Sequence, residues 1–129
     1  HPRTQKQLQN FDLWEEVLTH KKLGLLHPLG YHEMLKLNMN AKIMLTDSGG
    51  LQEECTVIGT PCMTLRWNTE RPITLRENGG ASVLVGNKID DIKNEYYKLM
   101  NSKFPPVYPP LWDGKTANRC LKSILNYKS

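Results

Sequence analysis

Residues 41–59 constrain the fold more than any other part of this sequence. Residues 41–46 form a mostly apolar run of strand length, which stops abruptly at the polar and glycine-rich residues 47–50. Apolar side chains then recur at helical spacing up to Gly59, a residue type that is common just past a helix end. The segment therefore predicts a strand, a tight turn and a helix in immediate succession.

The same alternation continues along the chain. Two further runs, 61–65 and 81–85, have the length and composition of buried strands, and helices are predicted over 69–78 and 89–100. An order in which strands and helices alternate predicts a parallel sheet with right-handed crossovers. The fold class that follows is α/β, with helices flanking the sheet.

The two ends of the chain carry weaker signals. Before the sheet we expect a helix with an irregular continuation over 8–17, a short strand over Lys22–Leu26 and a helix from Gly30 to about Asn40. After it, residues 103–110 hold four of the eight prolines and are predicted to run extended over the surface. A final helix is predicted over 116–127.

Composition excludes several classes of protein. A chain of 129 residues, 39% hydrophobic and 23% charged, fits one compact domain and neither a disordered nor a fibrous chain. It has no apolar run near the roughly 18 to 20 residues of a membrane span, and no signal-peptide pattern. We expect a cytoplasmic chain without a membrane partner. Because it begins His1-Pro2 instead of with methionine, we also expect it to start within a longer protein.

Charge and cysteine usage narrow the choice further. The 17 Lys and Arg exceed the 13 Asp and Glu, but they are scattered along the sequence, which is typical of a solvated surface and leads us to expect no nucleic-acid partner. The cysteines are odd in number and lack the spacing of a metal site. We expect reduced core thiols at Cys55, Cys62 and Cys120.

The turn at 46–50 is the best candidate for a site with chemistry. Two adjacent glycines let a ligand approach the backbone closely, and the unpaired N–H groups of a helix start favour phosphate. In parallel sheets, ligands also gather beyond the carboxyl ends of the strands. An N-capping Ser48 in a tight turn explains the same residues without a ligand, so both interpretations remain open.

Two neighbouring groups of residues strengthen the phosphate interpretation. A carboxylate in Gln52-Glu53-Glu54 can accept hydrogen bonds from a ribose, although acidic residues are also favoured in a first helical turn. Arginines in the loop 66–72 can neutralise a diphosphate, and an ion pair of Arg66 or Arg71 with Glu70 is an equal alternative.

Taken in order, these residues resemble the UDP-N-acetylglucosamine 2-epimerase family. Its C-terminal nucleotide-binding domain carries Thr-Asp-Ser-Gly-Gly-(Ile/Leu)-Gln-Glu-Glu and, later, Thr-Glu-Arg-Pro, and both occur unbroken here, at 46–54 and 69–72. The resemblance extends from His1-Pro2 to Asp113-Gly114 before the final helix. It covers nearly the whole chain.

The resemblance implies a GT-B-like protein with two Rossmann-like halves and the UDP-sugar between them. This chain would form part of the second half, with an incomplete UDP-binding domain over 1–102, a connector over 103–114 and a C-terminal helix over 115–129. It further implies that this helix packs on the absent half, so that Leu121, Ile124 and Leu125 would here be exposed or covered by a second chain.

The resemblance also implies a role for each site residue. Ser48, Gly49 and Gly50 would hold the diphosphate, and Arg71 the phosphate or its surrounding loop. Glu54 would bind the ribose hydroxyls. The uracil would be flanked by Leu29, through its backbone, and by Met34. No metal and no cofactor are implied.

The implied reaction is inversion at C2 of UDP-N-acetylglucosamine, by elimination of UDP to a 2-acetamidoglucal. UDP is then either added back or released together with free N-acetylmannosamine. The catalytic carboxylates of the family lie in the N-terminal half, so no catalytic residue is assigned here and the chain alone is expected to be inactive. The intact protein is expected to be a homodimer.

Two other functions fit the same residues. One is a free-standing module that binds a UDP-sugar without catalysis, because the residues present serve binding alone. The other is the donor-binding domain of a GT-B glycosyltransferase, which also holds a diphosphate on a glycine-rich helix start.

Overall fold

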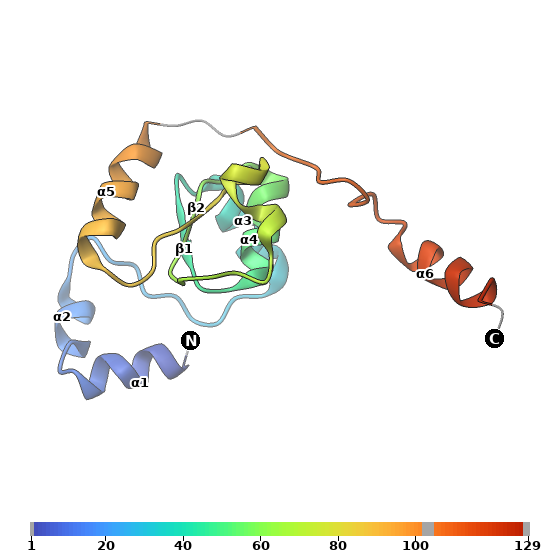
Figure 1. Cartoon of the computed structure of the whole chain (residues 1–129). Helices are drawn as coiled ribbons and strands as arrows, with labels where there is room; N and C mark the ends of the chain where they lie inside the picture. Colours follow the sequence, from blue (N-terminus) through green and yellow to red (C-terminus); the bar gives the residue numbers. More distant parts are fainter. Residues whose placement is uncertain (1, 102–104, 128–129) are drawn as a thin grey trace. The chain divides into compact units, whose positions relative to one another are not determined.

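The computed structural model describes residues 2–101 and 105–127. Its contacts divide the chain into a smaller unit, residues 1–34, and a larger unit, residues 35–129. The smaller unit contains α1 (Pro2–Asn10) and α2 (Trp14–Thr19), the blue helices of Figure 1. Between them Asp12 has φ 56°, in the left-handed region, so the predicted irregular helix is two short helices with a break.

The predicted strand at Lys22–Leu26 is wrong, because this segment has neither helix nor strand. A strand is stable only when its backbone N–H and C=O groups pair with a neighbouring strand. Within the described residues, the sheet gives this segment no such neighbour.

The larger unit contains a parallel sheet of three strands in the order β1 (Met44–Thr46), β2 (Cys62–Thr64) and β3 (Ser82–Leu84). Met44 lies opposite Cys62, and Cys62 lies opposite Ser82. Each strand lies within the run that predicts it, although it is shorter. The predicted α/β class with a parallel sheet is confirmed.

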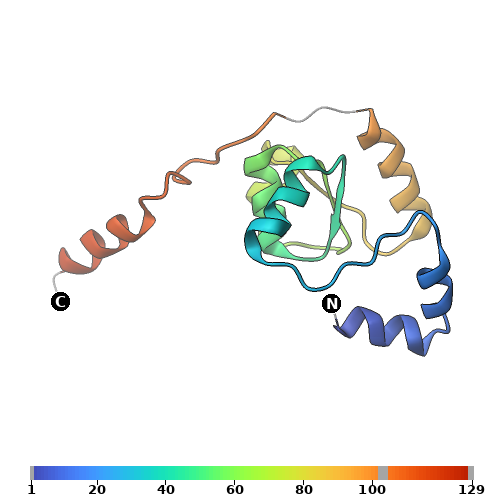
Figure 2. The ribbon, with the colours of Figure 1, turned by 180° about the vertical axis from the view of Figure 1, so that it is seen from behind.

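Helices cover both faces of this sheet, as the two opposite views show (Figures 1 and 2). One face is covered by α4 (Gly49–Ile58), beside α3 (Tyr31–Asn40), and the other by α5 (Ile89–Met100). The predicted helices at 30–40 and 89–100 are confirmed. In α4, Ser48 caps the first turn and Gly59, with φ 85°, ends the helix as predicted.

The core lies on both faces of β2. Successive residues of a strand point to opposite sides, so Cys62 packs with Cys55 of α4 while Met63 packs with Leu99 of α5. The prediction of buried thiols is confirmed for Cys55 and Cys62. It is wrong for Cys120, which is exposed.

The helix predicted over 69–78 is wrong. The segment forms two 3-10 turns, η1 (Pro72–Thr74) and η2 (Arg76–Asn78). The Arg71 carbonyl accepts hydrogen bonds from both the N–H and the hydroxyl of Thr74, which favours a three-residue turn over an α-helix. Gly80 then passes so close to the carbonyl of Thr74 that no Cβ fits there.

The C-terminal part contains an extended segment and α6 (Thr116–Leu125). Residues 103 and 104 of the predicted connector 103–114 lie outside the described residues. The same holds for residues 1 and 102 of the predicted domain 1–102 and for residues 128 and 129 of the predicted C-terminal helix region. Residues 105–109 have neither helix nor strand, and the N–H of Val107 donates to the carbonyl of Thr56.

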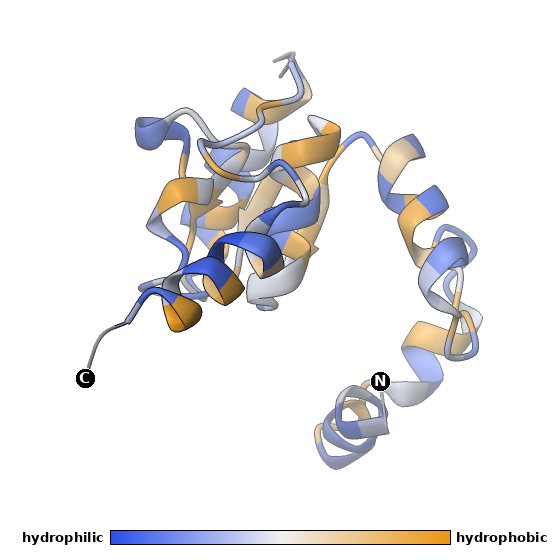
Figure 3. Cartoon of the chain, turned by 90° about the vertical axis from the view of Figure 1, so that its right-hand side faces the viewer, coloured by the Kyte–Doolittle hydropathy of each residue, from blue (hydrophilic) through white to orange (hydrophobic). Residues whose placement is uncertain are grey.

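One side of α6 is apolar and uncovered. The orange residues of this helix gather along one side in Figure 3. Leu121, Ile124 and Leu125 are 55%, 70% and 74% exposed, which confirms the expectation that they lack cover in this chain. The exposure of Cys120 has the same cause. None of the described helices has the length and apolar character required to cross a membrane.

Candidate functional site

The site begins where β1 ends and α4 starts. Ser48 has an extended backbone and its Oγ accepts from the N–H of Leu51 at 3.5 Å, so the N-cap is present. Its own N–H donates to Oγ1 of Thr46 at 3.1 Å. The next N–H groups, of Gly49 and Gly50, belong to the first turn of the helix, where no preceding turn supplies an acceptor. They give the turn its capacity to hold an anion.

The two glycines differ in their surroundings. A Cβ on Gly50 would have Ser48 Oγ, at 3.8 Å, as its nearest neighbour, so packing within the chain does not require glycine there. A Cβ on Gly49 would lie 2.9 Å from Oε1 of Glu70 and 3.6 Å from Cγ of Arg71. The loop that follows β2 therefore reaches the start of α4.

Both arginines of this loop face carboxylates. Nη1 of Arg66 lies 2.8 Å from Oε2 of Glu70, which is one of the two ion pairs left open by the sequence. Arg71 pairs instead with Glu53, with Nε 2.7 Å from Oε1. That short contact lacks the alignment of a hydrogen bond, and the buried atom Arg71 Nε has no acceptor among the residues that the structure describes. A diphosphate at Gly49 would thus meet a guanidinium that is already beside it and is paired with Glu53.

Glu70 is ionised at neutral pH. A hydrogen bond from its own backbone N–H, together with the charge of Arg66, holds the pKa of this carboxyl below its usual range. Because its oxygen lies beside Gly49, the unliganded site already has a negative charge near the helix start. An incoming anion has to displace it.

The remaining predicted site residues fall into two groups. Glu54 lies on α4 four residues after Gly50, on the same side of the helix, and is half-buried. Leu29 and Met34 belong to the smaller unit, where Leu29 is exposed and Met34 is half-buried in α3. The larger unit therefore brings together Ser48, Gly49, Gly50, Glu54 and Arg71, and the uracil contacts of Leu29 and Met34 stay predictions.

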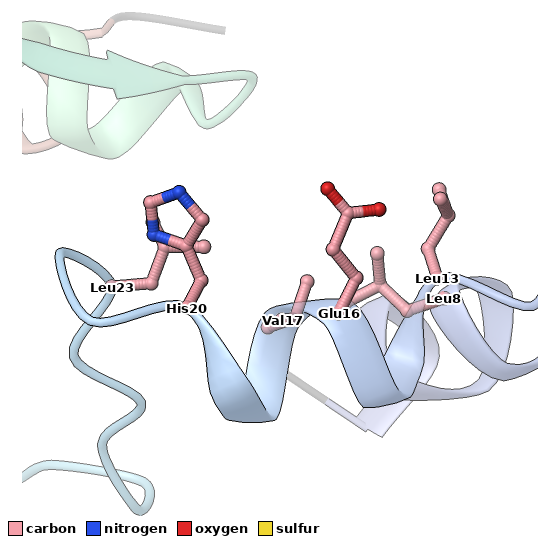
Figure 4. Close-up of a pocket in the computed structure, with 6 residues that line it drawn as sticks. All are labelled: Leu8, Leu13, Glu16, Val17, His20 and Leu23. Carbon is pink, nitrogen blue, oxygen red and sulfur yellow. The ribbon is translucent and has the colours of Figure 1, made fainter.

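The smaller unit contains a pocket whose lining differs from that of the glycine-rich turn (Figure 4). It is lined by Leu8, Leu13, Glu16, Val17, His20 and Leu23, which are mostly apolar. Nδ1 of His20 accepts a hydrogen bond from the N–H of Lys22, which is a structural role. In the part of the chain that the structure describes, no group of three His, Cys, Asp or Glu side chains is placed to hold a metal ion.

Sequence reasoning missed the polar side chains beneath the site. Gln52 is fully buried, and its Oε1 accepts from Oγ1 of Thr69 at 2.9 Å. The signal was present, because Gln52, Cys55 and Thr56 recur at helical spacing and mark the inner side of α4. A glutamine beside two glutamates nevertheless suggests a polar surface.

Comparison with known proteins decides the family. The profile of the UDP-N-acetylglucosamine 2-epimerase family matches residues 1–125. The chain belongs to this family. The expected resemblance is thereby confirmed, and the epimerase motifs at 46–54 and 69–72 are those that form the helix start and the loop beside it.

Individual epimerases agree with this assignment. The UDP-N-acetylglucosamine 2-epimerase of Methanocaldococcus jannaschii is 41% identical over 127 residues, which cover 98% of this chain and 34% of the relative. The crystal structure of that enzyme in complex with UDP-GlcNAc and UDP superposes with a TM-score of 0.80 at 38% identity, covering 95% of this chain and 34% of the other.

A structure with lower sequence identity supports the same family assignment. The UDP-GlcNAc 2-epimerase from Neisseria meningitidis, bound to UDP-GlcNAc, has a TM-score of 0.60 at 29% identity, over 98% of this chain and 34% of its own. The chain thus spans about a third of the length of the relatives it matches. Its fold is that part of the epimerase fold.

Proposed function

We propose that this chain is the nucleotide-binding part of a UDP-N-acetylglucosamine 2-epimerase. The observation that carries the proposal is the start of α4, where Gly49 and Gly50 offer backbone N–H groups and Arg71 stands beside them. In this assignment residues 1–102 form the UDP-binding domain, 103–114 the connector and 115–129 the C-terminal helix.

The diphosphate of the substrate binds at the helix start. The N–H groups of Gly49 and Gly50 and the positive end of the helix dipole meet its oxygens. Arg71 adds a full positive charge once the diphosphate replaces Glu53 as its partner. Ser48 holds the diphosphate together with the two glycines, and it also keeps the turn in place through its bonds to Leu51 and Thr46.

We assign the nucleoside to residues that precede and follow this turn in the sequence. Glu54 accepts hydrogen bonds from the ribose hydroxyls, from a position one turn after the glycines. The backbone of Leu29 and the side chain of Met34 flank the uracil. UDP-GlcNAc and UDP as ligands of the Methanocaldococcus jannaschii epimerase support this choice of substrate.

The reaction begins with elimination of UDP and of the C2 proton to give 2-acetamidoglucal. A proton then returns to the opposite face of C2 as UDP is added back at C1, or as water is added so that UDP and free N-acetylmannosamine are released. Charge develops on the diphosphate as its bond to the sugar breaks, and prearranged N–H groups and Arg71 stabilise that charge. The groups that move the C2 proton belong to the other half of the intact, homodimeric enzyme. This chain therefore binds the nucleotide and by itself turns over no substrate.

The proposal is tested by calorimetry of UDP and UDP-N-acetylglucosamine against the chain, two site variants and one control variant. Gly49→Asp and Gly50→Asp each place a carboxylate where the diphosphate lies, so both should abolish UDP binding. Gly24→Asp adds the same charge where a Cβ meets nothing within 4 Å, and it should bind like the unmodified chain.

Uridine provides the ligand control. It lacks phosphates, so its weaker binding should be insensitive to both aspartates. UDP binding that survives Gly50→Asp would contradict the phosphate site, and absence of UDP binding to the unmodified chain would contradict a complete diphosphate site within it. Epimerase turnover by the purified chain would contradict the assignment of proton transfer to the other half.

A further inference from the structure

The loop that carries Arg71 is attached to α4 through one buried side chain. Gln52 is fully buried in the first part of the helix, and its Oε1 accepts from Oγ1 of Thr69 at 2.9 Å. The hydroxyl of Thr74 lies 3.3 Å from the same oxygen. These two threonines lie on either side of Arg71 in the sequence, so one amide oxygen bonds to Thr69 and contacts Thr74.

The same two hydroxyls also fix the backbone of Arg71. Its N–H donates to Oγ1 of Thr69 at 3.0 Å, and its carbonyl accepts from Oγ1 of Thr74 at 2.7 Å. The peptide groups on both sides of the arginine are therefore held by groups that face Gln52. With its backbone fixed, Arg71 has its Nε and Cγ within 4 Å of the place where a Cβ on Gly49 would lie.

From this arrangement we infer that Gln52 is a positioning residue, which holds the guanidinium of Arg71 beside the diphosphate-binding turn. The inference rests on the function proposed above. Gln52 lies three residues after Gly49 and so connects the helix start and the arginine within one helical turn. The ion pair with Glu53 adds less constraint, because both of its side chains are more than a third exposed.

Stability alone does not account for a glutamine at this place. Nε2 of Gln52 is buried and has no partner among the described residues. A buried N–H group without an acceptor costs free energy that an apolar side chain of the same length would avoid. What glutamine provides, and methionine does not, is the acceptor for the hydroxyl of Thr69.

A second buried amide serves as the matched control. Asn38 is also fully buried, and its Nδ2 likewise has no partner in the described part of the chain. Its Oδ1 accepts from Sγ of Cys55 and its carbonyl from Oγ1 of Thr60, so its described hydrogen bonds do not involve the loop 69–74. Removing this amide disturbs the core to a similar degree without releasing Arg71.

The experiment follows the Nε–H signal of Arg71 by NMR hydrogen exchange in the full chain, together with the Kd for UDP. Nε is a buried atom in a side chain that is 42% exposed, so its proton should exchange more slowly in the unmodified chain than that of a fully exposed arginine. Gln52→Met and Thr69→Val should each speed exchange at least about tenfold and weaken UDP binding by roughly tenfold. Thr69→Ser, which keeps the hydroxyl, and Asn38→Leu should change neither.

The outcomes separate this inference from the proposed function. Unchanged exchange at Arg71 in Gln52→Met, equal damage by Thr69→Ser and Thr69→Val, or equal damage by Asn38→Leu would each overturn the positioning role. Faster exchange in Gln52→Met and Thr69→Val, but not in Thr69→Ser or Asn38→Leu, supports the positioning role. The exchange measurement needs no ligand, so it does not depend on UDP binding. If that pattern is seen while no form of the chain binds UDP, the diphosphate site fails and the positioning role stands.

Discussion

Replacement of Gly50 by alanine should raise stability and weaken nucleotide binding at the same time. Gly50 is the second residue of α4, and a Cβ there would meet nothing nearer than Ser48 Oγ at 3.8 Å. Alanine in a helix is favoured over glycine by about 0.5–1 kcal/mol. We expect a gain toward the lower end of that range, because the residue lies in the first turn.

The effect on binding has the opposite sign for a geometric reason. The Cα–Cβ bonds of a helix tilt toward its N-terminus, so the new methyl group projects into the space in front of the turn. In the proposed site, a diphosphate that accepts from the N–H of Gly50 would occupy that space. We expect UDP to bind at least about tenfold more weakly, which corresponds to about 1.4 kcal/mol.

Urea denaturation and calorimetry on the same protein samples measure both effects. Gly24→Ala is the control, since a Cβ at that position also meets nothing within 4 Å and lies outside the proposed site. Gly50→Ala that binds UDP as tightly as the unmodified chain would refute the close approach of the diphosphate. A loss of stability would refute the description of the helix start.

Three further predictions concern charge and exposure. Glu70→Gln removes a carboxylate from beside Gly49 and should tighten UDP binding about two- to fivefold, more so at low salt, as titrations at two ionic strengths would show. Hydrogen bonding to Arg119 holds the pKa of Asp113 below its usual value of 3.8. A carboxyl with a lowered pKa stabilises the fold above its ordinary pKa and loses that effect as the pH falls through the lowered one. The N-terminal turn of α6 should therefore stay formed down to about pH 4 and fray in stronger acid. Amide NMR signals of α6 followed against pH would detect this, and Asp113→Ala should fray at neutral pH. Cys120 should react with iodoacetamide in the folded chain, whereas Cys55 and Cys62 should react only in urea, as peptide mass spectrometry would reveal.

The sequence was sufficient to predict those parts of the structure that depend on residues adjacent in the chain. Ser48 caps α4 and Gly59 ends it because capping and left-handed backbone are local properties of those residue types. The apolar spacing of 89–100 gives α5 for the same reason. The motifs at residues 46–54 and 69–72 were sufficient to identify the family.

Contacts between residues that are distant in the chain could not be predicted from the sequence. A strand at Lys22–Leu26 needs a partner that no local pattern supplies, and the choice of Glu53 over Glu70 by Arg71 depends on where the loop meets α4. Cys120 is exposed because no described segment packs over its side of α6, which local sequence cannot indicate. In each case several local arrangements have similar energies, and packing selects one of them.

The glycine-rich turn after β1 is thus determined by the sequence itself, through a strand, a cap and a helix that form from adjacent residues. The tertiary structure alone decided which side chains stand around it. Gln52 and Thr69 are 17 residues apart, and only folding brings them within hydrogen-bond distance. The burial of Gln52 then fixes the place of Arg71, because a buried acceptor has to find its donors within the protein.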